Sequence, residues 1–197
     1  MVTGLHAAQV TPRIPPLEAG DHLDQATFHE RYKAMPSAFR AELIGGIVIV
    51  PSPLAQGHGL YHALVMAWLG NYWIATPGTQ ALDSATTILG EMSEPQPDGA
   101  LVIEPACGGQ TSVSEDEYMT GPPELIIEVA SSSASIDLHA KRRDYERAGV
   151  LEYMVVVLRQ RVIRWFVLQA GAYQEMAADT DGRFSLSGGQ EASLGLC

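Results

Sequence analysis

Apolar residues recur at helical spacing in three stretches of this chain of 197 residues, and each stretch predicts a helix. The predicted helices cover residues 21–34, 56–74 and 136–148, and Gly149 supplies the stop signal of the last one. The first helix is expected to face Leu23, Phe28 and Tyr32 inward. One side of the second helix carries Leu60, Leu64, Ala67, Trp68 and Tyr72.

Aliphatic runs bounded by Gly, Pro and Ser predict the strands. The segment from Phe39 to Val50 is typical of a hairpin that turns at Gly45-Gly46. A helical turn is expected at residues 114–119. The other predicted strands cover residues 80–89, 99–103, 123–129, 151–158, 162–168, 172–177 and 184–186, the last being weak.

This mixture of elements favours one domain of the α/β (α+β) class, in which helices flank a mixed β-sheet. We find no internal repeat and no linker that would divide residues 21–197. Residues 1–20 contain Pro and Gly without a clear period, and we interpret them as a mobile N-terminal arm.

The chain is acidic, with twelve Lys and Arg against twenty-three Asp and Glu and a formal net charge of −11. This balance argues against a general nucleic-acid coat protein, because neutralising phosphates requires positive charge. Seven of the twelve basic residues nevertheless lie within residues 141–164, so an enzyme acting on nucleic acid is not excluded. Two cysteines, no signal-peptide pattern and no apolar stretch long enough to span a bilayer predict a cytoplasmic location without membrane contact.

Glu128 stands inside a short aliphatic run, residues 123–129, which predicts a buried strand. A carboxylate there needs a strong partner, because an unpaired buried charge is costly. Asp98 lies at the start of another aliphatic run, residues 99–103, so its carboxylate is expected at a strand end.

Lys141 lies on the third predicted helix. It shares one face with Leu138, Tyr145 and Ala148, which follow the spacing of three and four residues. Because that face is otherwise apolar, it should pack on the sheet and point Lys141 toward Glu128.

These residue types suit metal-dependent phosphodiester cleavage. Carboxylates hold Mg²⁺ or Mn²⁺, the ion activates a water, and a lysine stabilises the negative charge of the transition state. We therefore take Asp98 and Glu128 as candidate metal ligands and Lys141 as the candidate catalytic cation. Glu42, in the predicted hairpin, is a fourth candidate for the site.

Three ordered motifs resemble those of the Uma-type family, whose members are assigned as restriction endonucleases within the PD-(D/E)xK nuclease superfamily. In that family the lysine has moved from the strand position two after the glutamate, here Ala130, onto the following helix, which matches Lys141. The resemblance covers about residues 22–186 and extends to the hairpin and His58. The motifs are Gln96-Pro97-Asp98, then Pro123-Glu124-Leu125-Ile126-Ile127-Glu128-Val129, then Asp137, Lys141-Arg142, Tyr145, Ala148-Gly149-Val150 and Glu152-Tyr153.

The resemblance implies a restriction-endonuclease-like core with Mg²⁺ as cofactor. This chain departs from the family at two places. Gly45 stands in the hairpin turn where the family often has an acidic residue. Met154 and Val157 stand where it often has an aromatic and an acidic residue, so polar groups beside the helix of Lys141 are missing.

Each candidate also has a structural interpretation. Asp98 can start a strand or cap a turn, Glu128 can pair with an arginine, and Lys141 can pair with Asp137 alone. Glu42 can lie on the exposed face of its hairpin. His58 is expected as a surface or capping residue. We expect Glu91, Glu94, Glu115, Asp116 and Glu117 to be solvated loop charges, and Trp68, Tyr72 and Trp73 to serve the core or an interface.

Two functional hypotheses follow. The first is a Mg²⁺-dependent endonuclease that cuts double-stranded DNA as a homodimer, with residues 162–168 and 172–177 as an apolar surface with an open edge. RNA is an alternative substrate. The second is a nuclease fold kept as a non-catalytic binding or assembly module, which the acidic balance and Met154 and Val157 favour.

Overall fold

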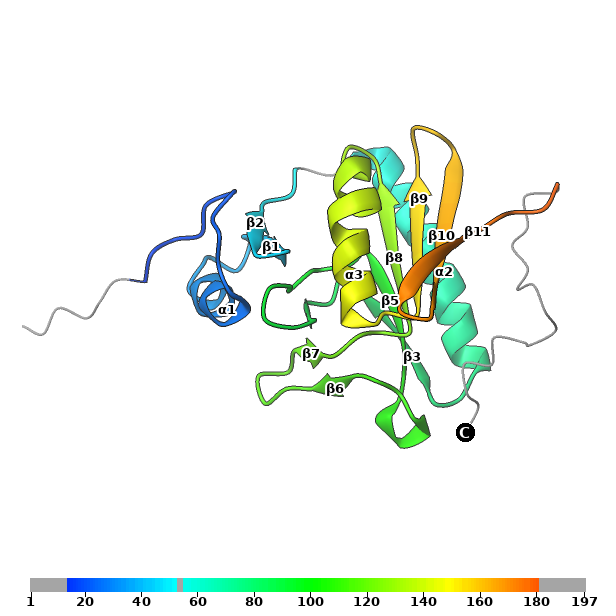
Figure 1. The fold of residues 1–197 in the computed structure, drawn as a ribbon, viewed down its shortest axis with the longest axis horizontal. Coiled ribbons are helices and arrows are strands. Elements are labelled where there is room, and N and C mark those ends of the chain that lie inside the picture. The colour runs from blue at the N-terminus through cyan, green and yellow to red at the C-terminus, as the bar shows by residue number, and fades with distance from the viewer. Residues whose placement is uncertain (1–13, 53–54, 181–197) are drawn as a thin grey trace, which may run out of the picture.

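A six-stranded sheet forms the centre of the computed structural model, which describes residues 14–52 and 55–180 (Figure 1). β8 and β9 are parallel, and the other neighbouring pairs are antiparallel. The sheet is therefore mixed, and the predicted fold class is confirmed. In spatial order its strands are β11 Ala172–Met176, β10 Val162–Gln169, β9 Glu152–Val157, β8 Leu125–Ala130, β5 Gly99–Ile103 and β3 Thr79–Asp83.

Helices cover both faces of this sheet (Figure 1). The long helix α2, Gln56–Ala75, packs on one face, where Leu69 meets Leu101 and Ile127. On the other face η2, Ile136–Lys141, is wound as a π-helix and continues as α3, Arg142–Ala148. This helical crossover joins the parallel strands β8 and β9, as such a pair requires.

A second, smaller core lies beside the sheet. Helix α1, Gln25–Lys33, buries Phe28 against the hairpin of β1, Glu42–Ile44, and β2, Ile47–Ile49. Leu23 and Tyr32 pack on this cluster, as predicted. Leu17 is also buried in it, so the described part of the predicted N-terminal arm contacts the hairpin; residues 1–13 lie outside the described part of the chain.

Two glycine positions follow their predicted roles. Gly45 and Gly46 both have positive φ, 58° and 78°, as a two-residue hairpin turn requires. Gly149 has φ 89° and ends the crossover helix in the left-handed conformation.

Two predictions about secondary structure are wrong. Residues 80–89 form two strands, β3 and β4 Thr87–Ile88, because the chain leaves the main sheet after Asp83. Residues 114–119 form no helical turn: they connect β6, Ser112–Val113, to β7, Met119–Thr120, which pairs with β4 in a three-stranded sheet. The short helix η1, Pro105–Cys107, precedes them. The weak strand predicted at residues 184–186 falls outside the described residues.

The residues expected to share one side of α2 are divided between the surface and the core. Leu60, Leu64 and Trp68 are 61%, 57% and 44% exposed, whereas Leu69 is buried with Val65, Met66 and Tyr72 against it. The helix is apolar on all sides, so hydrophobic periodicity does not define which face turns inward. No helix in the described part of the chain is both long and apolar enough to cross a lipid bilayer.

Candidate active site

Glu128 lies on the face of β8 that the crossover helix covers. Side chains alternate along a strand, so Ile126, Glu128 and Ala130 point to one side. Ile126 and Ala130 belong to the core cluster that contains Tyr145 of α3. Glu128 is only 4% exposed, and its carboxylate is therefore held between sheet and helix.

Lys141 meets this carboxylate from the last residue of η2. Its Nζ lies 2.9 Å from Oε1 of Glu128 and 2.9 Å from Oε1 of Glu42, while Oδ1 of Asp137 is 3.9 Å away. Lys141 is 5% exposed and Asp137 is 2% exposed. Lys141 is therefore the centre of a buried cluster and does not pair with Asp137 alone. We call Lys141, Glu128, Glu42 and Asp137 the Lys141 cluster.

Glu42 reaches this cluster from the hairpin, where it is buried instead of lying on an exposed face. Its Oε1 also accepts a hydrogen bond from the backbone N–H of Gln96, at 2.7 Å. The carboxylate thus ties β1 to the segment that leads to Asp98 and orients Lys141 at the same time.

Two tyrosines complete the cluster. The hydroxyl of Tyr145 donates to Oε1 of Glu128 at 2.8 Å, and that of Tyr153 donates to the backbone carbonyl of Asp137 at 2.9 Å. Their rings pack edge to face, with centroids 4.9 Å apart. Neither tyrosine is among the candidate site residues derived from the sequence, although the helical spacing places Tyr145 on the same face as Lys141.

Asp98 lies at the start of β5. Its Oδ2 accepts a hydrogen bond from the backbone N–H of Val129, at 2.7 Å, so its carboxylate is tied to the residue that follows Glu128. Nε2 of His58 lies 3.3 Å from the same oxygen. His62, one helical turn further along α2, has its Nε2 2.9 Å from the backbone carbonyl of Asp98 and 3.1 Å from Oδ1 of Asp83.

The sequence predicts His58 as a surface or capping residue, and this prediction is wrong. It is 6% exposed, and its Nδ1 is buried without a hydrogen-bond partner. The first turn of α2 directs this imidazole at Asp98, and only the tertiary packing of α2 on the sheet brings the two residues together.

The prediction for Glu94 is wrong as well. Glu94 is fully buried instead of solvated, and it accepts hydrogen bonds from Nε2 of Gln25 and pairs with Nδ1 of His29, both at 2.8 Å. It anchors α1, so its role is structural. Glu91 and Asp116, from the same group of predicted loop charges, are exposed as expected.

The Lys141 cluster contains three carboxyl groups and one ammonium group. Burial raises the pKa of Glu128 well above its usual range, although Lys141 opposes this shift, and burial raises the pKa of Asp137 in the same way. Burial alone would lower the pKa of Lys141, but Glu128, Glu42 and Asp137 together outweigh it and raise that pKa. We infer that Lys141 stays charged, and three carboxyl groups face this one cation.

This excess of carboxylate suits a hard divalent cation. Within the described residues, no three His, Cys, Asp or Glu side chains are grouped so as to hold a metal ion by themselves. Mg²⁺, however, is commonly bound by one or two carboxylates together with waters and substrate phosphates. Asp98 and Glu128 provide two such carboxylates on neighbouring strands, so the donor set fits this mode of binding.

Met154 and Val157 are both buried apolar residues. Met154 packs in the cluster under α2, and Val157 packs in the cluster under α3. Both also line a cavity of about 520 Å³ between α2 and strands β9 and β10.

Comparisons with known proteins identify the family of this chain. The family model "Uma2: Putative restriction endonuclease" matches residues 26–194, and the chain belongs to this family. Membership supports a nuclease-like function with nucleic acid as the substrate. Among solved structures, a "putative nuclease belonging to DUF820" from Anabaena variabilis has a TM-score of 0.59 and 12% sequence identity, covering 75% of this chain and 82% of that chain. At this identity the likeness shows the fold alone. No curated protein matches.

Proposed function

We propose that the protein is a metal-dependent endonuclease that hydrolyses phosphodiester bonds in double-stranded DNA. The observation that carries this proposal is the buried ammonium of Lys141, held 2.9 Å from Glu128 on the strand beside Asp98. A lysine fixed against the carboxylate of one strand, with a second carboxylate at the start of the neighbouring strand, suits phosphodiester hydrolysis.

Asp98 and Glu128 would hold Mg²⁺ or Mn²⁺ through their carboxylate oxygens. When bound, the ion supplies a water of lowered pKa and stabilises negative charge on the phosphate. Lys141 places a permanent positive charge beside these carboxylates and stabilises the oxyanion that develops in the transition state. Glu42 assists by orienting Lys141, and Tyr145 orients Glu128 by its hydrogen bond.

The surroundings of Lys141 suit a polyanionic substrate despite the acidic composition. Arg143 and Arg147 are exposed on α3, the helix that continues from Lys141. They offer phosphate contacts near the site, and such contacts position a nucleic acid without selecting its sequence.

The test is nicking of supercoiled plasmid in the presence of Mn²⁺. Lys141→Met keeps the apolar stem and removes the charge, and should abolish nicking. Lys33→Met is the matched control, because Lys33 is the only other lysine in the sequence and pairs with Asp116 at the surface. Nicking that survives Lys141→Met would overturn the catalytic role of Lys141.

A non-catalytic binding or assembly module is the second candidate. Two ion pairs of Lys141 favour this candidate. Its ammonium already neutralises one oxygen of Glu128 and one of Glu42, so the cluster holds together without a metal ion. This candidate predicts that neither the wild type nor any variant nicks DNA. An RNA substrate is tested in the same assay with a structured RNA in place of the plasmid.

A further inference from the structure

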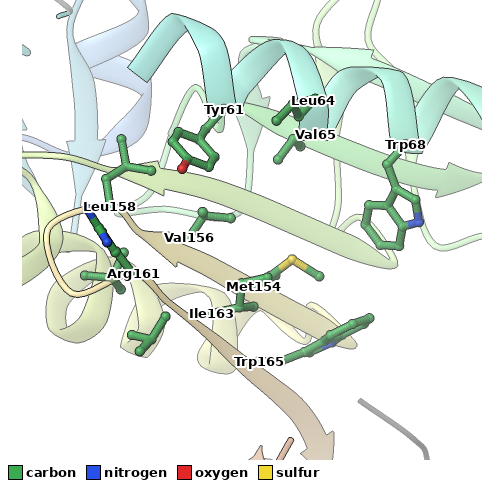
Figure 2. Close-up of a pocket in the computed structure, with 12 residues that line it drawn as sticks. Tyr61, Leu64, Val65, Trp68, Met154, Val156, Leu158, Arg161, Ile163 and Trp165 are labelled. Carbon is green, nitrogen blue, oxygen red and sulfur yellow. The ribbon is translucent and has the colours of Figure 1, made fainter. Parts of the chain in front are cut away.

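The cavity that Met154 and Val157 line is a groove between α2 and strands β9 and β10, on the face of the sheet opposite the Lys141 cluster. Figure 2 shows side chains from the helix facing side chains from the strands across it. Its volume of about 520 Å³ is within the range of small-molecule sites, which are mostly apolar with a few polar groups. Of the twelve described residues that line it, only Arg161 is charged, and the others are aliphatic or aromatic.

The two ends of this groove differ in chemistry. At one end the rings of Trp68 and Trp165 meet edge to face, with centroids 6.3 Å apart. At the other end lie Tyr61, Leu158 and Arg161 (Figure 2). Trp165 follows Arg161 by four residues along the extended chain, so about 13 Å of apolar wall separates the two ends.

Arg161 presents a cation that the protein itself does not neutralise. Its side chain is exposed, and within residues 14–52 and 55–180 its guanidinium forms no ion pair and no hydrogen bond. The hydroxyl of Tyr61 also has no hydrogen-bond partner in this part of the chain. A guanidinium and a phenol are donors, and a guanidinium matches the geometry of a carboxylate. This end of the groove is therefore suited to an anionic group.

The backbone of Arg161 is unusual as well. The residue closes the turn between β9 and β10 with φ 55°, in the left-handed region that glycine adopts more readily than arginine. Residues held in such conformations are concentrated at functional sites. Here the strained position is the one from which a cation lines the groove.

We propose that the groove binds a small amphipathic carboxylate, with its head group on Arg161 and its hydrocarbon tail directed toward Trp68 and Trp165. A single guanidinium neutralises a head group of one negative charge, which favours a carboxylate over a phosphate monoester of nearly two charges. The tryptophan end offers an anion no free indole donor, because Nε1 of Trp165 already donates to Glu152 at 2.9 Å. This asymmetry sets the direction of the ligand.

Other occupants fit this groove less well. A neutral apolar ligand leaves Arg161 without a partner. A nucleic-acid strand requires several cations for its phosphates, whereas the twenty residues of α2 include no Lys and no Arg. A protein partner requires an interface of about 800 Å² on each side, far more than a groove that encloses one small molecule.

Titration of the full chain with decanoate, followed by tryptophan fluorescence, tests this proposal, because Trp68 and Trp165 line the groove. The emission of the wild type should change saturably. Arg161→Gln should weaken decanoate binding about tenfold, through loss of a hydrogen bond between charged groups. Arg159→Gln is the matched control: it removes the same charge from the same turn, but Arg159 does not line the groove, so decanoate affinity should be unchanged.

Decan-1-ol has the same tail without the charge, and it should bind the wild type and Arg161→Gln equally. Arg161→Gly is a second variant that suits the left-handed backbone, so it should lose decanoate affinity without loss of stability in urea. Absence of saturable decanoate binding by the wild type would overturn the proposal. Equal affinity of the wild type and Arg161→Gln would do so too, as would equal weakening by Arg159→Gln, which would indicate a general effect of charge. None of these measurements depends on nuclease activity.

Discussion

Lys141 and Glu128 form a buried ion pair, with Nζ 2.9 Å from Oε1, although thirteen residues separate them in the sequence. The pair joins the crossover helix to β8. Ala130, two residues after Glu128 on the same strand face, is completely buried in the core beneath α3. The helix therefore supplies the cation at a place where the strand contributes only a small apolar side chain.

Removing the charge of Lys141 should destabilise the metal-free protein. Lys141→Met leaves the carboxylates of Glu128 and Glu42 buried without their cation, and breaking a buried pair in this way costs about 3–5 kcal/mol. We expect the free energy of unfolding at neutral pH, measured in urea, to fall by about that amount. The surface control Lys33→Met should change it by less than about 1 kcal/mol. Equal stability of the two variants would show that the cluster is not ionised as we infer.

The sequence was sufficient to place Lys141 but not to orient α2, and the reason is amphipathicity. The helix of Lys141 has one apolar face among charged residues, so its inward direction can be derived from spacing alone. α2 has no charged residue, so several faces are equally apolar and tertiary packing decides between them. The surface position expected for His58 is wrong for the same reason, because its contact with Asp98 depends on that packing.

Long-range contacts account for the other misplaced residues. Glu94 stands among Ser, Pro and Gln, which is typical of a solvated loop, yet its partners Gln25 and His29 lie 69 and 65 residues away. Asp137 lies at the start of a predicted helix, where an acidic residue is common, yet η2 turns it into the core. Local patterns do not encode such contacts.

Truncating Glu94 should therefore weaken the small core around α1. Glu94→Ala leaves the side chains of Gln25 and His29 without their acceptor, and we expect a loss of about 1–3 kcal/mol in the free energy of unfolding. Glu91→Ala, three residues away and exposed, should change it by no more than about 0.5 kcal/mol. Urea unfolding of the two variants side by side gives this comparison. A neutral Glu94→Ala would mean that these hydrogen bonds contribute no net stability.

Glu152 should make stability depend on pH. Burial raises its pKa above the ordinary 4.5, and the hydrogen bond that Nε1 of Trp165 donates at 2.9 Å opposes the shift only in part. The folded state thus binds this proton more tightly than the unfolded state. The stabilising contribution is present at low pH and is lost as the pH rises from 4.5 through the folded-state pKa.

Glu152→Gln removes this titration and keeps an oxygen that can accept the hydrogen bond from Trp165. The free energy of unfolding of the variant, measured against wild type in urea at a series of pH values, should therefore improve as the pH rises above 4.5. Taking the difference between the two proteins cancels the titration of all other groups. A difference that stays constant across this range would show that the two states bind the proton of Glu152 equally.

Binding of Mn²⁺ should raise the melting temperature of the wild type, and this effect should depend on the proposed ligands. An ion at a hundred times its dissociation constant adds about 2.7 kcal/mol to the free energy of unfolding. Asp98→Asn and Glu128→Gln should each abolish this gain, since they remove the charge of a carboxylate that would hold the ion. Glu117→Gln, on an exposed turn, should retain it in full. Equal stabilisation of Asp98→Asn and the wild type would place the ion elsewhere.

His58 gives a graded version of the same experiment. Its Nε2 lies 3.3 Å from Oδ2 of Asp98, so we expect the imidazole to orient that carboxylate without holding the ion itself. Loss of an orienting partner typically weakens metal binding by about 10–100-fold. When His58→Ala is titrated with Mn²⁺, its melting temperature should therefore reach the wild-type plateau only at higher Mn²⁺ concentrations.

His62→Ala is the control. It removes a contact to the backbone carbonyl of Asp98 and leaves the carboxylate in place, so the Mn²⁺ concentration needed should rise less. If both variants bind Mn²⁺ as tightly as the wild type, the backbone N–H of Val129 alone is sufficient to orient Asp98.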